Sequence, residues 1–244
     1  MPDRARYAQL ERLLRPGRLL EIGPGGGHFL AAAREKGHEV TAVELSPKNR
    51  AFIDRHWGIT VSGELIEEDR QPANHFQSVV SFNCIEHVLD PVKLMTSVRR
   101  VLAPGGVFVL TTCSADSLLS RLPGGYWTMC KQPDHVSIGG AKSFTRAAAR
   151  AGLGVREVFF SEYPLETPLG VLSALRDAWR ERRSREGVPG GVTATAQFAQ
   201  TLPTWANWLR TRLQRWEPRW SPANLTSRFG VSSTIGIQLE RPSK

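Results

Sequence analysis

Apolar residues along this chain follow two alternating patterns. Short apolar runs, typical of strands buried in a sheet, alternate with segments whose apolar residues recur every three or four positions, as in helices that pack on a core. The short runs predict strands at residues 18–22, 40–44, 59–62, 78–82, 107–112, 155–160 and 234–240. The helical spacing predicts helices at residues 4–15, 29–36, 47–56, 91–102 and 143–151.

The order of these elements predicts the fold. Strands that alternate with helices across short turns form βαβ units and a mostly parallel sheet. Ser46 and Asp90 are placed to cap two of the helices, each with a proline at the first helical position. We therefore expect an α/β, Rossmann-like fold with a seven-stranded, mostly parallel sheet and helices on both faces. Such sheets bind ligands at the carboxyl ends of their strands, where the glycines after residue 22, Glu44 and Asn83 fall.

Residues 164–230 depart from this pattern. They are rich in arginine and hold five of the seven tryptophans, namely Trp179, Trp205, Trp208, Trp216 and Trp220. We expect a helical insertion in a core domain that comprises residues 1–163 and is closed by a strand within residues 231–244. Three interpretations are open: a lid over the substrate, a peripheral membrane contact through residues 176–220, or the interface of a homodimer.

Composition and charge narrow the class of protein. The 244 residues are 41% hydrophobic, enough for one large α/β domain. The net charge of +9 would suit an anionic partner, but it is spread along the chain, which favours general solubility. The sequence shows neither an apolar run long enough to span a membrane nor a secretory signal, so we expect a cytoplasmic protein. The three cysteines have no metal-ligand spacing, and no metal site is expected.

The segment from Glu21 to His28 carries the main functional signal, because four of its residues are glycines. Glycine lacks a Cβ atom, so the backbone can turn sharply and approach a ligand closely. A helix that begins after such a loop directs free N–H groups at the ligand. The third small residue of a dinucleotide fingerprint would fall at His28, and the Gly-Lys-Ser/Thr of a phosphate loop is absent. The loop therefore argues against a nicotinamide dinucleotide or a nucleoside triphosphate.

This E-x-G-x-G-x-G segment resembles motif I of the class I S-adenosylmethionine-dependent methyltransferases. Residues 76–88 resemble the family's F-D-V-V…E-H-V stretch, with Gln77 where the family usually has aspartate, and residues 102–107 resemble its L-x-P-G-G turn. The four motifs occur in the family's order and spacing between residues 18 and 112. Within that family, the chain resembles ubiquinone-biosynthesis-like methyltransferases and those that modify glycans and natural products. The resemblance implies the Rossmann-like class I methyltransferase fold.

The resemblance also implies the cofactor, S-adenosylmethionine, with S-adenosylhomocysteine as product. Glu44 matches the acidic residue that accepts hydrogen bonds from both ribose hydroxyls, which suits the two acceptor oxygens of a carboxylate; the alternative is a solvated strand end. Glu64 and Leu65 match the pair that holds adenine, or else form a surface turn. The expected cofactor-binding residues are Glu21, Gly23, Pro24, Gly25, Gly27, His28, Glu44, Leu45, Glu64, Leu65, Asn83, Cys84 and His87.

Two histidines are candidate catalytic residues. A hydroxyl acceptor usually needs a base, and imidazole exchanges protons near neutral pH. His135 follows the fifth strand in a segment that resembles relatives acting on hydroxyl groups; it is the first candidate, and the alternative is a histidine that only fixes its loop. His87, in the E-H-V motif, is the second candidate or else bonds a neighbouring loop. Asp134 is not expected to pair with His135, because neighbours in an extended loop point apart. The other four histidines are expected at the surface.

These observations favour transfer of a methyl group to a small molecule at a hydroxyl oxygen, as in a secondary metabolite, a sugar or a quinone-like compound. One alternative is a lipid- or glycan-linked substrate at a membrane surface. Another is a cofactor-binding regulatory or partner subunit without activity. Nucleic acid is disfavoured, because the segment from Asn83 to Glu86 stands where a base-methylating D/N-P-P-Y tetrad would fall.

Overall fold

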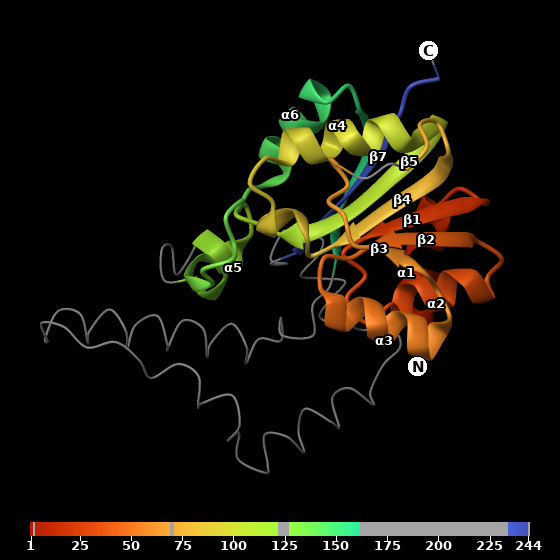
Figure 1. Ribbon diagram of the computed structural model, residues 1–244. Coiled ribbons are helices and arrows are strands. Elements are labelled where there is room, and N and C mark those ends of the chain that lie inside the picture. Colours follow the sequence, from red (N-terminus) through yellow and green to blue (C-terminus); the bar gives the residue numbers. More distant parts are fainter. Residues whose placement is uncertain (2, 69–70, 122–126, 162–233, 244) are drawn as a thin grey trace, which may run out of the picture.

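A seven-stranded sheet forms the centre of the computed structural model, which describes residues 1, 3–68, 71–121, 127–161 and 234–243 (Figure 1). The strands lie in the order β3-β2-β1-β4-β5-β7-β6. Their bounds are Arg18–Ile22 (β1), Glu39–Val43 (β2), Val61–Ser62 (β3), Phe76–Phe82 (β4), Leu102–Cys113 (β5), Gly154–Ser161 (β6) and Thr234–Glu240 (β7). The predicted α/β fold with a seven-stranded sheet is thus confirmed.

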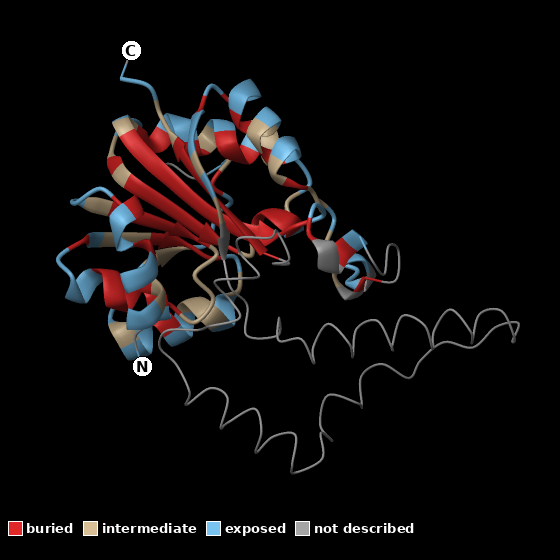
Figure 2. Ribbon diagram, turned by 180° about the vertical axis from the view of Figure 1, so that it is seen from behind, coloured by how far each residue is buried: buried red, intermediate tan, exposed pale blue. Residues whose placement is uncertain are grey.

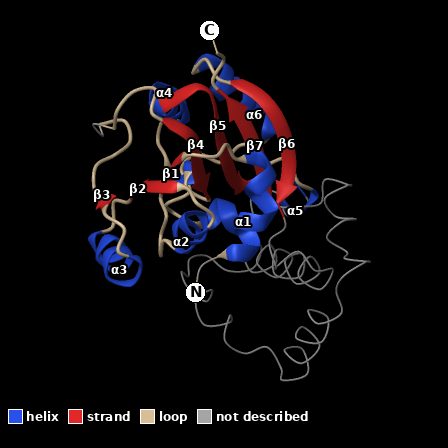
Figure 3. Cartoon of the chain, turned by 90° about the vertical axis from the view of Figure 1, so that its right-hand side faces the viewer, coloured by secondary structure: helices blue, strands red, loops and turns tan. Residues whose placement is uncertain are grey.

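Helices cover both faces of the sheet (Figures 1 and 3). One face carries α1 (Arg4–Leu10), α2 (His28–Glu35) and α3 (Pro47–Trp57); the other carries α4 (Pro91–Val101) and α6 (Ala141–Arg150). Shorter elements are α5 (Leu118–Arg121) and the 3-10 helices η1 (Glu11–Leu13), η2 (Ile85–His87) and η4 (Thr128–Lys131). The elements that follow β4 and β5, among them η2, lie at the carboxyl ends of those strands, where the fold binds ligands.

The core consists of two apolar layers, one on each face of the sheet. Successive strand residues point to opposite faces, so Leu19 packs in the layer of α1, α2 and α3, whereas Leu20 packs in the layer of α4 and α6. Both side chains are fully buried. Figure 2 shows the central strands buried along most of their length, which explains why their sequences are continuous apolar runs. Burying each such leucine stabilises the fold by about 2 kcal/mol.

The register of the central strands sets up the ligand-binding edge. β1 pairs in parallel with β2 on one side and with β4 on the other, and the last residue of β1, Ile22, lies opposite Val43 and Ser81. The order of the strands reverses between β1 and β4, which is the switch point at which open α/β sheets bind ligands. β7 runs antiparallel to both β5 and β6. The segments that follow β1, β2 and β4 therefore meet at one edge.

Two predicted helix starts are confirmed by their caps. The Ser46 hydroxyl oxygen accepts a hydrogen bond from the Asn49 N–H at 3.3 Å, and the Asp90 carboxylate accepts from the Val92 and Lys93 N–H groups at 3.0 Å each. Each cap satisfies backbone donors that have no partner within the helix.

Other predicted bounds differ from the structure. The first helix ends at Leu10 and continues as the 3-10 helix η1, rather than running to residue 15. β5 begins at Leu102 rather than at residue 107, because Leu102 already pairs with Phe76. Pairing with β4 then skips to Ser78 opposite Val107, so the Pro-Gly-Gly turn is an irregularity inside one strand.

The surface position predicted for His38 is wrong. His38 is buried, and its Nε2 lies 2.9 Å from the Tyr7 hydroxyl of α1. The helix that covers His38 comes from a distant part of the chain, so the residues next to His38 in the sequence did not indicate its burial.

The predicted insertion at residues 164–230 and its five tryptophans lie outside the described residues. The domain division and the lid, membrane and dimer interpretations therefore stay predictions. Among the described helices, none is long and apolar enough to cross a membrane.

Candidate functional site

The glycine loop between β1 and α2 adopts a conformation that requires glycine. Gly23, Gly25 and Gly27 have φ angles of +70°, +54° and +70°, a region that other residues rarely adopt. A Cβ atom on Gly27 would lie 2.9 Å from the Ile53 side chain of α3, so this position also lacks room for a side chain. No atom comes within 4 Å of a Cβ built on Gly25, and the loop is therefore open at that residue.

Glu44 ties this loop to the end of β2. Its carboxylate accepts hydrogen bonds from the Gly25 N–H at 3.0 Å and from the Ser46 N–H at 2.8 Å. The residue is 9% exposed, so it is not the solvated strand end that was the alternative. Each carboxylate oxygen has a second lone pair, which leaves room for two hydroxyl donors.

Glu21, in β1 just before the loop, is a buried carboxyl group. Burial raises the pKa of Glu21 to about 8, and the nearby Arg6 charge opposes this rise. Its Oε2 atom has no hydrogen-bond partner among the described residues. A buried acceptor without a donor is costly, so the site suits a ligand that brings a positively charged donor.

Asn83 and Cys84 bring the end of β4 to the same loop. Asn83 has a φ of +48°, which asparagine tolerates better than most residues, and its N–H donates to the Thr111 carbonyl oxygen at 2.8 Å. A Cβ atom on Gly23 would lie 3.1 Å from the Cys84 sulfur, so the two residues are in contact. Burial raises the pKa of the Cys84 thiol to about 11, which makes it a neutral packing group rather than a nucleophile.

Four further expected cofactor residues are exposed at the surface, namely His28, Leu45, Glu64 and Leu65. Leu45 is 55% and Leu65 44% exposed, which leaves two apolar side chains free to cover a flat ring. Glu64 is exposed, and its N–H donates to the Ser62 hydroxyl oxygen at 3.3 Å. His28 is also exposed; its Nδ1 lies 2.9 Å from the Met1 carbonyl oxygen. Cofactor contacts of these residues, of Pro24 and of the other expected cofactor residues all stay predictions.

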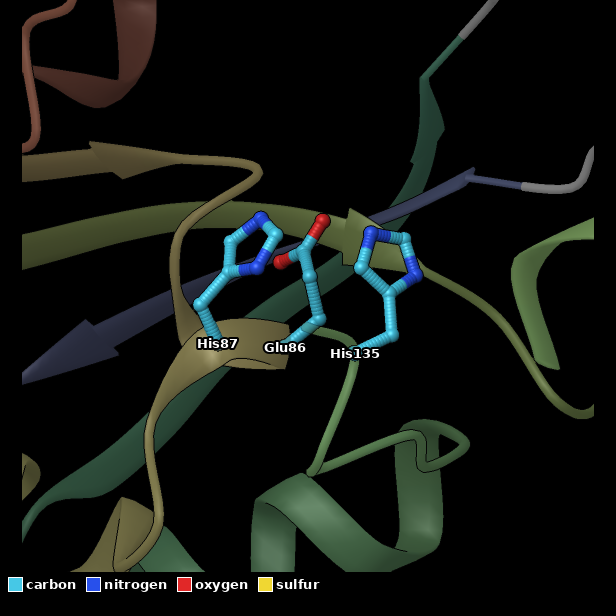
Figure 4. Close-up of side chains that lie close together, drawn as sticks. All are labelled: Glu86, His87 and His135. Carbon is cyan, nitrogen blue, oxygen red and sulfur yellow. The ribbon is translucent and has the colours of Figure 1, made fainter. Parts of the chain in front are cut away.

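A second group of side chains lies beyond the end of β4. Glu86 and His87 belong to η2, and His135 comes from the loop after β5, so the structure brings both candidate bases together. Figure 4 shows the Glu86 carboxylate beside the two imidazole rings, which meet edge to face with their centroids 4.8 Å apart. Glu86 is only 2% exposed, and its Oε2 accepts a hydrogen bond from the Thr112 hydroxyl at 2.9 Å. We call Glu86, His87 and His135 the histidine cluster.

Backbone hydrogen bonds hold the loop that carries His135. The Val136 and Ser137 N–H groups donate to the Glu86 carbonyl oxygen at 2.8 and 2.9 Å, and the Ser137 hydroxyl donates to the Val88 carbonyl oxygen at 2.6 Å. The Nδ1 atom of His135 is buried without a hydrogen-bond partner in the described part of the chain. The backbone thus fixes the loop, and the His135 side chain is available for another role.

His87 is oriented by the same loop. Its Nδ1 lies 3.0 Å from the Asp134 carbonyl oxygen and 3.4 Å from the Asp134 carboxylate. A proton on Nδ1 leaves Nε2 as the free acceptor of this ring. The loop contact expected as the structural alternative for His87 is therefore present, and Asp134 pairs with His87 rather than with its neighbour.

Three residues of this site, namely Glu86, Thr112 and Asp134, had no role assigned from the sequence. Glu86 and His87 stood within a recognised motif, but only the fold shows that Thr112 and Asp134 contact them. The only sequence signal was the alternation that places residue 112 at the end of a strand. No local pattern joins residue 87 to residue 134.

Comparison with known proteins agrees with this architecture. A family model described as a methyltransferase domain matches residues 3–158. A ubiquinone biosynthesis O-methyltransferase of Thiobacillus denitrificans is 27% identical over 169 residues, which cover 64% of this chain and 73% of that protein. Another, from Cereibacter sphaeroides, is 29% identical over 119 residues, covering 46% and 48%. The chain therefore spans about half the length of some of the curated relatives that it matches.

Solved structures share the fold at low identity. A geranyl diphosphate C-methyltransferase of Streptomyces coelicolor, solved with S-adenosylhomocysteine, aligns with a TM-score of 0.62 at 15% identity and covers 97% of this chain and 80% of that one. A SAM-dependent methyltransferase of Archaeoglobus fulgidus aligns at 0.60 with 16% identity, covering 97% and 92%. The family model covers well over half of the chain, and the cofactor common to these proteins is S-adenosylmethionine. The chain belongs to the methyltransferase domain family.

Proposed function

We propose that the protein transfers a methyl group from S-adenosylmethionine to a hydroxyl oxygen of a small molecule. The observation that carries this proposal is the histidine cluster next to the glycine loop. Cys84 contacts Gly23 of the loop, and Glu86 follows two residues later, so the groups that could handle a proton lie beside the groups that would hold the cofactor. The named activity of the curated relatives, O-methylation, supports the same acceptor atom.

The described residues fit the cofactor. Glu44 offers acceptor oxygens for the two ribose hydroxyls, and the orphan oxygen of Glu21 suits the ammonium of the amino-acid end. Leu45 and Leu65 provide exposed apolar surface for the adenine ring. When bound, S-adenosylmethionine supplies a methyl group on a sulfonium that is already activated for displacement. The protein's own contribution is to align the two reactants and to manage the acceptor's proton.

His135 is proposed as the group that takes this proton. The acceptor oxygen forms its bond to the methyl carbon while the carbon–sulfur bond breaks, and the hydroxyl proton passes to the imidazole and then to water. His87, held by Asp134, stands beside it as the second candidate. Two apolar neighbours of the cluster, Leu89 and Val136, are 88% and 50% exposed. They support an acceptor that has an apolar part next to its hydroxyl, such as a quinone-like phenol.

A panel of phenols, sugars and aliphatic alcohols, with methyl-labelled S-adenosylmethionine, tests the proposal. The expected product is a labelled methyl ether, formed together with one equivalent of S-adenosylhomocysteine. Label on carbon or nitrogen of the acceptor would overturn the choice of oxygen. Cofactor binding without transfer to any compound of the panel would favour the regulatory-subunit alternative.

A further inference from the structure

The geometry points to a divalent-cation site formed by Glu86, His87 and His135, with a first-row transition metal such as Zn²⁺ as its occupant. Each side chain offers one ligand atom, and these atoms lie within 4.8 Å of one another. Tetrahedral zinc ligands, at bond lengths of about 2.1 Å, stand about 3.4 Å apart. The side chains therefore need to close by up to about 1.4 Å, which rotation of their outer bonds allows. The mixture of imidazole and carboxylate favours Zn²⁺ or its neighbours over Mg²⁺.

The groups around His87 and Glu86 already have the arrangement that metal ligands require. A metal-bound histidine usually donates its other ring N–H to a carbonyl or a carboxylate, and His87 lies within reach of both in Asp134. Ligating carboxylates are likewise held by hydrogen bonds, as Glu86 is by Thr112. These outer contacts leave the Nε2 atom of His87 and one Glu86 oxygen free to bind.

The burial of Glu86 points to a cation. Glu86 is 2% exposed and makes no ion pair with a residue of the described part of the chain. A carboxylate so deeply buried is costly unless a positive charge compensates it. Figure 4 shows the Nε2 atom of His135 turned toward Glu86 and its Nδ1 atom turned away, so a cation beside Glu86 would bind Nε2.

This inference rests on the same side chains as the proposed function and changes how they act. Three protein ligands leave a coordination position open, as in catalytic rather than structural zinc sites. An acceptor hydroxyl bound at that position would lose its proton to water more readily, because the cation stabilises the oxygen anion that remains. The imidazoles would then be ligands, and His135 would not itself take the proton.

Cobalt titration of the full chain, after treatment with a chelator, tests the site without any substrate. We expect one equivalent of Co²⁺ to bind with a visible absorption spectrum of a four- or five-coordinate nitrogen–oxygen site, and Zn²⁺ to displace it. Glu86→Gln, His87→Gln and His135→Gln should each weaken binding at least tenfold. His56→Gln, which changes an exposed histidine of α3 outside the cluster, is the matched control and should bind as the unaltered protein does.

Two results would overturn the site: no stoichiometric binding of Co²⁺ or Zn²⁺ to the unaltered chain, or binding that the three cluster variants leave unchanged. If a variant fails to fold, the cobalt spectrum of the unaltered protein and a rise of its Tm with Zn²⁺ still decide the question. Calorimetry with S-adenosylhomocysteine, with and without the chelator, separates this inference from the proposed function. Loss of cation binding alone leaves methyl transfer in place, with His135 as the base.

Discussion

The two sides of the ligand-binding edge are built in different ways. On the side proposed for the cofactor, called the cofactor side and defined by Glu21, the glycine loop and Glu44, the key contacts join neighbouring strands and hold the backbone in place. On the acceptor side, the histidine cluster joins η2 to a loop 48 residues away, so its side chains meet only through the fold. The first side is shaped mainly by backbone geometry and the second by side-chain chemistry. Changes on the two sides should therefore separate binding of the cofactor from turnover.

The largest expected effect is loss of turnover on the acceptor side. His135→Ala should lower kcat by a factor of about 10² to 10⁴, the usual range for a proton-handling residue, and leave cofactor affinity unchanged. The loss is expected whether His135 takes the proton or binds a cation. Steady-state kinetics with a responsive acceptor, together with calorimetry for the cofactor, provides the measurement. Normal turnover in this variant would remove His135 from the mechanism.

A change on the cofactor side should affect binding instead. Glu44→Gln loses charged hydrogen bonds to the ribose and to the Gly25 and Ser46 N–H groups, each worth about 1.5–3 kcal/mol, so cofactor affinity should fall about 100-fold. Glu39→Gln, at the exposed start of the same strand, is the matched control and should bind normally. Equal affinities in the two variants would contradict the role assigned to Glu44.

The two sides differ in how well the sequence predicts them, because their contacts join residues at different separations along the chain. The glycine loop and Glu44 each follow a strand that apolar runs reveal, so the sequence predicted their positions after β1 and β2, and their contacts with the cofactor stay predictions. The contacts of Asp134 with His87 and of Thr112 with Glu86 depend on how distant segments meet, and no local pattern carries that information. The buried position of His38 was missed for the same reason, since Tyr7 reaches it from α1.

Because of Glu21, the free energy of unfolding should depend on pH. Burial raises its pKa to about 8 from an unfolded value of 4.5, so between these values the folded chain keeps a proton that the unfolded chain has lost. Without cofactor, this contribution is fully present below pH 4.5, and the free energy of unfolding then falls by up to about 1.4 kcal/mol per pH unit as pH rises toward 8. Urea unfolding from pH 5 to pH 8 measures this slope.

Glu21→Gln should flatten that slope, because the variant carries no titrating group at this position. Glu11→Gln, an exposed carboxylate in η1, is the control and should keep the slope of the unaltered protein. An identical slope in the unaltered protein and in Glu21→Gln would show that Glu21 does not hold a proton in the folded state.

The smallest effect is expected for Asp134, because both its backbone carbonyl and its carboxylate lie near His87. Asp134→Ala removes the carboxylate 3.4 Å from His87 Nδ1 but keeps the carbonyl oxygen at 3.0 Å, so His87 stays oriented. Turnover and cobalt affinity should each change by less than about threefold, in the range of an exposed ion pair. A tenfold loss of either would mean that the carboxylate, and not the carbonyl, holds the ring.

Isothermal titration calorimetry of the purified chain with S-adenosylmethionine and S-adenosylhomocysteine tests the central claim most directly. We expect each to bind one site per chain with a Kd in the micromolar range, about −8 kcal/mol. A chain that binds neither compound would contradict the assignment of the glycine loop and Glu44 as the cofactor site, and the proposed methyl transfer with it.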